Sequence, residues 1–203
     1  MYLFSLPYLP NIAWFQHVLQ YKKIVISGGE HYVKQTYRNR CHILNTNGVQ
    51  TLIIPVKYSN TQKTPYNQLQ PDNSVKWQQQ HWNSLVAAYG KSAFFFHYRH
   101  FFEPYYDKTI ENVFYFNLGL LKLILKLLKA EVEIEVTDYY IDNVNANVDF
   151  RNKFNPKKSR VEELLFQKKY HQVFAEKFSF ESNLSIVDLL FNRGTETIDF
   201  LVG

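Results

Sequence analysis

The chain has 203 residues, of which 46% are hydrophobic and 20% charged, and its formal net charge is +5. This composition excludes a disordered chain, and the length fits one domain with a sizeable core. A single cysteine, Cys41, excludes an internal disulfide and a cysteine-rich zinc site.

The net charge of the chain bears on its binding partners, and its first residues bear on its cellular location. A net charge of +5 permits an anionic partner such as a sugar nucleotide or a nucleic acid, and it equally fits an ordinary surface with spare lysines. The chain begins without a basic region or a small-residue cleavage site, so we expect no signal peptide. Because no stretch reaches about 18 uncharged apolar residues, we expect no membrane span and a cytoplasmic protein.

The N-terminal half is predicted to contain one helix and three strands. Apolar residues around Trp14 recur at helical spacing. Residues 23–26 form a β-branched apolar run typical of a buried strand, which ends at Gly28–Gly29. Strands expected at 37–44 and 49–56 should pair as a hairpin, because an Asn-Gly sequence separates them.

The C-terminal half continues the pattern. Helices are predicted at 76–89 and 111–129, and alternating Glu and Val or Ile predicts a strand at 131–136. Residues 143–160 are polar and basic, so we expect a mobile loop there. A short helix at 184–192 and a second one directly after it complete the chain.

Strands thus alternate with helices, which favours an α/β fold. No internal repeat or low-complexity block divides the chain. We expect a single compact domain over residues 1–203, with one mixed sheet that contains the predicted strands and helices that flank it.

The densest polar segment runs from Lys34 to Arg40. If it is extended, Lys34, Arg38 and Arg40 share one face and repel one another unless an anion lies among them. The planar fork of arginine matches the oxygens of phosphate or carboxylate. The segment therefore fits an anion site, and it equally fits a solvent-facing basic strand that pairs with Glu30 or Glu103.

A second group of residues lies on the helix predicted at 76–89. At 100° per residue, Trp77 and His81 share one stripe, and the neighbouring stripe is apolar. A histidine at the border of such an aromatic wall can be a general base, a ligand or a satisfied polar group of the core. No carboxylate is placed to form a metal site with His97 and His100, and no dinucleotide or phosphate-loop fingerprint is present, so the residues specify no metal and no cofactor.

Three blocks of sequence carry a family resemblance. The first, Glu30–Ile43, contains a Lys, an aromatic residue and an Arg-Asn-Arg triplet, and precedes a strand that ends at Pro55–Val56. The second runs from Trp77 to Phe95, and the third is Asn183–Gly194. In order and spacing, over nearly the whole chain, these blocks resemble the WbqC-like family of bacterial proteins, most closely its branch in Bacteroidetes-type bacteria.

The chain departs from that family at its start. Many members read His-Gln-Pro-x-Tyr-x-Pro-Trp, and this chain keeps Tyr8 and Pro10 of the motif. Phe4 stands in place of the histidine and Asn11 in place of the tryptophan. The difference bears on the type of reaction more than on the fold.

The resemblance implies a role in surface polysaccharide biosynthesis, with transfer of an aminoacyl or acyl group to the amine of a nucleotide-linked amino sugar. It implies His81 as the catalytic base, with Tyr37 and Trp77 stacked on a base or sugar. The substrate-binding residues expected on this basis are Lys34, Tyr37, Arg38, Asn39, Arg40, Tyr8 and Trp77.

Two other classes of function stay open. A non-catalytic module that binds an anionic glycan or nucleotide would need the cations but not His81. A nucleic-acid binder, suggested by the basic charge and abundant aromatic residues, is less favoured. The expected partner is a small anionic substrate, either a sugar nucleotide or an acyl donor. If the implied function is right, Arg38 and His81 should border one cavity.

Overall fold

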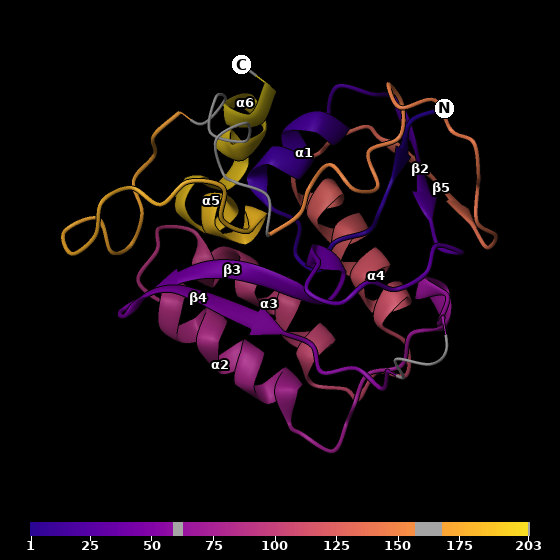
Figure 1. Ribbon diagram of the computed structural model, residues 1–203. Coiled ribbons are helices and arrows are strands. Elements are labelled where there is room, and N and C mark those ends of the chain that lie inside the picture. Colours follow the sequence, from indigo (N-terminus) through magenta and orange to yellow (C-terminus); the bar gives the residue numbers. More distant parts are fainter. Residues whose placement is uncertain (59–62, 157–167, 203) are drawn as a thin grey trace.

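The computed structural model describes residues 1–58, 63–156 and 168–202. Its strands form two separate sheets, which lie in different parts of the molecule (Figure 1). A parallel sheet has the order β1-β2-β5, with β1 at Leu3–Phe4, β2 at Lys23–Ser27 and β5 at Glu133–Thr137. An antiparallel hairpin joins β3 (Arg40–Asn45) to β4 (Gly48–Ile53).

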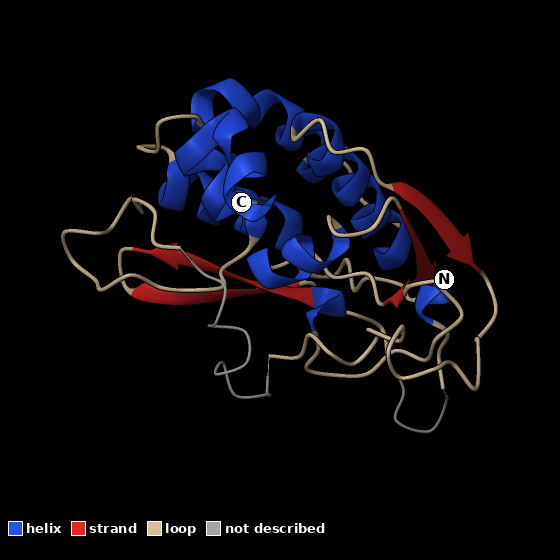
Figure 2. Ribbon diagram, turned by 90° about the horizontal axis from the view of Figure 1, so that it is seen from above, coloured by secondary structure: helices blue, strands red, loops and turns tan. Residues whose placement is uncertain are grey.

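The helices gather on one side of both sheets (Figure 2). Helix α4 runs between the parallel sheet and the hairpin, and its aromatic and aliphatic side chains are largely buried (Figure 1). None of the helices in the described ranges is both long and apolar enough to cross a membrane. The α-helices are α1 (Ile12–Val18), α2 (Trp77–Tyr89), α3 (Phe95–Tyr106), α4 (Val113–Leu127), α5 (Ile186–Arg193) and α6 (Thr197–Val202). Short 3₁₀ turns are η1 (Tyr37–Asn39), η2 (Tyr66–Gln68) and η4 (Gly194–Glu196).

The expected α/β architecture, with a sheet flanked by helices, is confirmed. The strands predicted at 23–26 and 131–136 pair directly, as β2 and β5. The predicted strands do not share one sheet, because the hairpin pairs only with itself among the described residues. The strand predicted at 37–44 starts three residues late, since the backbone first makes the turn η1.

The carboxyl ends of the three parallel strands meet at one edge of their sheet. Ser5 follows β1, the segment Gly28–His31 follows β2, and Asp138–Tyr140 follows β5. Both glycine N–H groups donate to the carbonyl oxygen of Thr137, at 2.9 and 3.2 Å. Ligands of open parallel sheets bind outside this edge of the strands.

The loop predicted at 143–160 contributes to the same edge. Leu3 in β1 donates its N–H to the carbonyl of Val148 at 2.8 Å, and accepts from the N–H of Phe150 at 2.7 Å. Phe150, Arg151 and Phe154 are buried. These contacts fix residues 148–154 beside the sheet. Residues 157–160 lie outside the described ranges, and the mobility of the loop stays a prediction.

Gly29 offers a test of how tightly the carboxyl edge is built. A Cβ atom at this position would lie 2.2 Å from the backbone carbon of Tyr139, which is closer than real Cβ contacts come. Because the obstacle is backbone rather than a flexible side chain, we expect Gly29→Ala to lower the free energy of unfolding by about 1–3 kcal/mol. Urea denaturation measures the loss. The control is Asn83→Ala on the exposed side of α2, which should change stability by less than about 0.5 kcal/mol. Equal stability of both variants would contradict this account.

Candidate functional site

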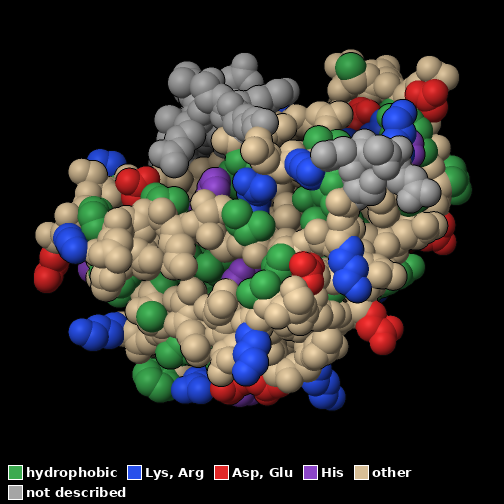
Figure 3. Space-filling model, turned by 60° about the horizontal axis from the view of Figure 1, so that its bottom comes forward, with side chains coloured by type: hydrophobic (Ala, Val, Ile, Leu, Met, Phe, Trp, Pro, Cys, Tyr) green, Lys and Arg blue, Asp and Glu red, His purple; other side chains and the backbone are tan. Residues whose placement is uncertain are grey.

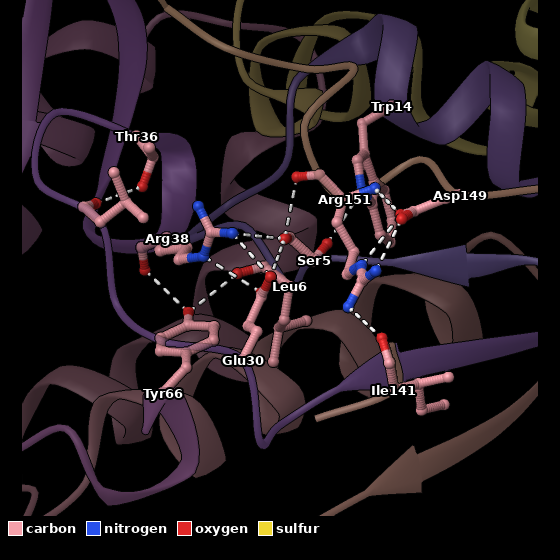
Figure 4. Close-up of polar contacts among 11 residues, drawn as sticks. Ser5, Leu6, Trp14, Glu30, Thr36, Arg38, Tyr66, Ile141, Asp149 and Arg151 are labelled. Atoms are coloured by element: carbon pink, nitrogen blue, oxygen red, sulfur yellow. Dashed lines mark hydrogen bonds and ion pairs between the residues drawn. The ribbon is translucent and has the colours of Figure 1, made fainter. Parts of the chain in front are cut away.

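A buried ion pair between Arg38 and Glu30 forms the centre of the site (Figure 4). The guanidinium donates from Nη2 to Oε2 of the carboxylate at 2.7 Å and from Nε to Oε1 at 3.1 Å. Arg38 is 4% exposed and Glu30 is 3% exposed. Neither charge could be buried alone without a large cost, so each requires the other.

Ser5 joins this pair to the end of β1. Its hydroxyl accepts from Nη2 of Arg38 at 2.8 Å. The hydroxyl proton has two acceptors within reach, Oε2 of Glu30 at 2.8 Å and the carbonyl oxygen of Arg151 at 3.0 Å. Ser5 therefore connects the ion pair to the loop that carries Arg151.

The backbone behind Arg38 is held from the core side. Its carbonyl oxygen accepts from Nδ2 of Asn117 at 2.8 Å. The Tyr66 hydroxyl has two carbonyl acceptors within reach, that of Arg38 at 2.9 Å and that of Leu6 at 2.8 Å. Burial raises the pKa of the Tyr66 phenol well above its ordinary value, so the hydroxyl stays a donor. Asn117 lies on α4, so the central helix fixes the turn from which Arg38 projects.

A second arginine lies beside the first. Arg151 binds Asp149 through two bonds, Nη2 to Oδ2 at 2.6 Å and Nε to Oδ1 at 2.9 Å. Its Nη1 donates to the carbonyl oxygen of Ile141 at 2.9 Å. Burial would raise the pKa of the Asp149 carboxyl, but the bonds from Arg151 outweigh it and lower that pKa. Both arginines are thus matched by a carboxylate.

A small cavity lies between the two arginines. Its volume is about 10 Å³, room for roughly one water-sized group. Among the described residues, Nη1 of Arg38 has no hydrogen-bond partner, and Figure 4 shows it pointing away from Glu30 on the side of Thr36. It can therefore donate to an oxygen of a bound ligand. The cavity is lined by Ser5, Leu6, Pro7, Trp14, Thr36, Tyr37, Arg38, Phe150, Arg151 and Phe154.

The predicted cationic face from Lys34 to Arg40 does not form. Gln35 has a φ of 60°, and the residues after it turn into η1, so alternate side chains do not share a face. Lys34 instead places Nζ 4.6 Å from the ring centroid of Tyr58, and Arg40 begins β3. Of the three cations, only Arg38 belongs to the cluster with Glu30.

The other residues predicted in this segment have partners in the core. Nδ2 of Asn39 donates to the carbonyl oxygen of Ile54 at 2.9 Å. Tyr37 lines the cavity and is itself buried, and its carbonyl accepts from the N–H of Tyr8 at 2.8 Å. Tyr8 thereby connects η1 to the region around His81.

His81 is enclosed by aromatic side chains. Its Nδ1 lies 2.9 Å from the Tyr8 hydroxyl, which in turn lies 2.9 Å from the Tyr106 hydroxyl. The Trp77 ring meets His81 edge-on at 5.2 Å and is 1% exposed. Burial lowers the pKa of His81 to about 4, although a hydrogen bond with the Ile53 backbone opposes this. The ring is therefore neutral at pH 7. Neither His81 nor Trp77 lines the cavity beside Arg38. This cavity therefore does not join Arg38 to His81, contrary to the expectation that the two residues border one cavity.

A separate buried carboxyl group lies at the start of α5. Asp188 is 1% exposed, and its Oδ2 accepts from the Tyr170 hydroxyl at 2.6 Å and from Nε2 of Gln172 at 3.2 Å. Burial raises the pKa of Asp188 to about 6, and its hydrogen bonds only partly oppose the rise. This cluster attaches the segment 170–172 to α5.

Comparison with known proteins identifies the family of the chain. A model of the WbqC-like protein family matches residues 7–200. The chain belongs to the WbqC-like protein family. Uncharacterized protein Rv1507c of Mycobacterium tuberculosis (strain ATCC 25618 / H37Rv) is 25% identical over 221 aligned residues, which cover 96% of this chain and 94% of that protein. No solved structure matches the chain significantly.

Phe4, at the position where the resemblance implies a histidine, has no polar role in this chain. Phe4 is fully buried, stacks on Phe150 at 4.8 Å and meets Trp14 edge-on at 5.8 Å. Within the described residues, no cluster of three or more His, Cys, Asp or Glu side chains is arranged to hold a metal ion. The polar groups at this end of the chain come from Ser5 instead.

Reasoning from the sequence did not predict Ser5, Asp149 or Arg151 as members of the site. Ser5 follows a strand of only two residues, too short for a periodicity signal. Asp149 and Arg151 lie in a polar stretch, but Phe150 and Phe154 beside them are an apolar signal that the segment packs against the core.

The buried ion pair gives a direct stability test. In Glu30→Gln, the Arg38 cation stays buried without its counter-charge, so we expect a loss of roughly 3 kcal/mol or more in the free energy of unfolding. Glu196→Gln is the matched control, because Glu196 also contacts an arginine, Arg193, at 2.7 Å but is mostly exposed. It should cost less than about 0.5 kcal/mol. Urea denaturation measures the free energy of unfolding of both variants, and equal losses in the two would contradict a buried ion pair.

Asp188 predicts a specific pH dependence. Because its pKa in the folded state, about 6, exceeds its ordinary value of 3.8, the folded protein holds this proton at pH values where the unfolded chain has lost it. The free energy of unfolding should therefore fall as the pH rises from about 4 to 7. We expect Asp188→Asn to remove this fall, so that wild type loses on the order of 3 kcal/mol relative to the variant across that range. Denaturation curves between pH 4 and 7.5 measure it, and parallel profiles would contradict the assignment.

Proposed function

We propose that this protein binds a nucleotide-linked amino sugar at the carboxyl edge of the parallel sheet and transfers an aminoacyl or acyl group to its amine, in surface polysaccharide biosynthesis. The observation that carries the proposal is the buried guanidinium of Arg38, whose Nη1 has no hydrogen-bond partner in the described part of the chain and lies beside a cavity. The class of reaction is the one that the resemblance to the WbqC-like family implies, and the chain belongs to that family.

In this proposal, the ligand's oxygen is recognised by the fixed direction of an N–H donor of Arg38 more than by the net charge of the site. Arg38 is matched by Glu30 and Arg151 by Asp149, so the cluster presents little uncompensated positive charge. A fixed N–H donor still recognises an oxygen of phosphate or carboxylate through a charge-assisted hydrogen bond. Tyr37 completes the wall of the cavity.

The chemical step requires a base. The amine nitrogen attacks the carbonyl carbon of the donor, a C–N bond forms, the donor's leaving group departs with its bonding electrons, and the amine proton passes to a base. His81 is the proposed base. It is neutral at pH 7, but its Nδ1 contacts the Tyr8 hydroxyl and its pKa of about 4 is low for holding a proton. We propose that the Tyr8 hydroxyl takes the amine proton and passes its own proton to Nδ1 of His81. The backbone N–H of Tyr8, which takes no part in this transfer, donates to the carbonyl of Tyr37 in the cavity wall.

The enclosure of His81 also favours a second candidate function. A non-catalytic module for an anionic glycan or nucleotide would use Arg38 and leave His81 as a satisfied core residue. The nucleic-acid alternative has less support. Lys and Arg side chains are scattered over the face shown in Figure 3 instead of forming one continuous patch, whereas nucleic-acid binding favours a basic patch or stripe.

Calorimetric titration with a uridine diphosphate-linked amino sugar tests the anion site. Arg38→Lys keeps a positive charge opposite Glu30 but removes the planar fork, so we expect binding to weaken by about 1.5–3 kcal/mol. Arg193→Lys, at a more exposed ion pair, is the control and should bind as wild type. Unchanged affinity in Arg38→Lys would overturn the site.

Mass spectrometry of the sugar after incubation with aminoacyl and acyl donors separates the enzyme from the binding module. In His81→Gln, with folding checked by thermal denaturation, we expect N-acylation to be lost while sugar-nucleotide affinity is kept. Retained turnover would remove His81 from the mechanism. Binding without acylation by wild type, across the donors, would favour the module.

A further inference from the structure

Two exposed aromatic rings lie at the same edge of the sheet as the arginine cluster. Tyr140 follows β5 and is 50% exposed, and His31 follows β2 and is also exposed. Their rings are nearly parallel, at 10°, with centroids 6.3 Å apart. Although Arg151 and His31 contact the Tyr140 ring, half of this side chain stays exposed, so the pair offers ring area that a ligand can reach.

Arg151 joins these rings to the cavity. Its guanidinium carbon lies 4.7 Å from the Tyr140 ring centroid, while the same residue lines the cavity beside Arg38. The backbone of Tyr139, next to Tyr140, packs closely against Gly29, which places the ring pair beside the segment after β2. Arg151 thus lies between the ring pair and the cavity that Arg38 also lines.

We propose that Tyr140 and His31 form the stacking surface for the nucleobase of the bound nucleotide. This inference rests on the proposed function, because the nucleobase belongs to the same ligand whose phosphate or sugar oxygen contacts the arginine cluster. The rings assumed from the sequence to stack on the ligand, Tyr37 and Trp77, are 8% and 1% exposed and offer little free face. Tyr140 and His31 are accessible and lie beside Arg151, which suits a ligand with a planar ring next to an anionic group.

Uridine monophosphate and ribose 5-phosphate are the two probes, since both carry the ribose phosphate and only the first carries the base, where the second has an anomeric hydroxyl. We expect wild type to bind uridine monophosphate about 5- to 150-fold more tightly, the range that base stacking on one aromatic side chain gives. Tyr140→Ala should bring the two affinities together, His31→Ala should reduce the difference, and Tyr140→Phe should keep it. Arg38→Lys should weaken both probes by a similar factor.

Tyr139→Ala is the matched control. Tyr139 is the neighbouring residue, is 68% exposed and has no ring partner among the described residues, so its loss should leave both affinities unchanged. Equal binding of the two probes by wild type would overturn the stacking surface while leaving the anion site in place. Failure of both probes and of the sugar nucleotide to bind would overturn the proposed function together with this inference. An effect of Tyr139→Ala as large as that of Tyr140→Ala would assign the stacking to another surface.

Discussion

The ion pair of Arg38 with Glu30 is the constraint on which the architecture of the site depends. A buried arginine must have a counter-charge, and here the carboxylate comes from the segment after β2 while the guanidinium comes from a turn before the hairpin. The bonds from Ser5, Tyr66 and Asn117 then fix the atoms around the pair. Breaking any one of these contacts leaves a charge or a polar group unsatisfied in the core, which lowers the free energy of unfolding.

The polar network and the aromatic core fix each other's positions. Tyr8 contacts η1 through its backbone and His81 through its hydroxyl, so the region beneath the hairpin is coupled to the region beside the parallel sheet. Aromatic rings fill the space between, with edge contacts such as that of Trp77 with Phe116. Most of the aromatic rings of the chain are therefore part of the packed core, and only a few are exposed at the surface.

Local periodicity was sufficient to predict β2, β5, the hairpin and helices α2, α4 and α5, because each has a strong apolar pattern within a short window. Helix α3 was missed, since it is rich in aromatic residues around its whole circumference and contains Pro104. The face predicted for residues 34–40 was wrong because the tertiary pairing of Arg38 with Glu30 and the turn at Gln35 override a strand-like alternation. The membership of Arg151 in the site follows from the path of the chain past β1, which no local pattern in the sequence specifies.

The cluster around Ser5 is assembled from segments that are far apart along the chain. The hydroxyl of Ser5 bonds to the backbone of Arg151 across 146 positions, and the partners of β2 lie in both halves of the sequence. Contacts of such long range must close large loops of the chain, which makes the topology one that folds slowly for its size. A fragment that ends before residue 150 would lack this wall of the cavity, and occupation of the cavity by a ligand would stabilise both halves of the domain together.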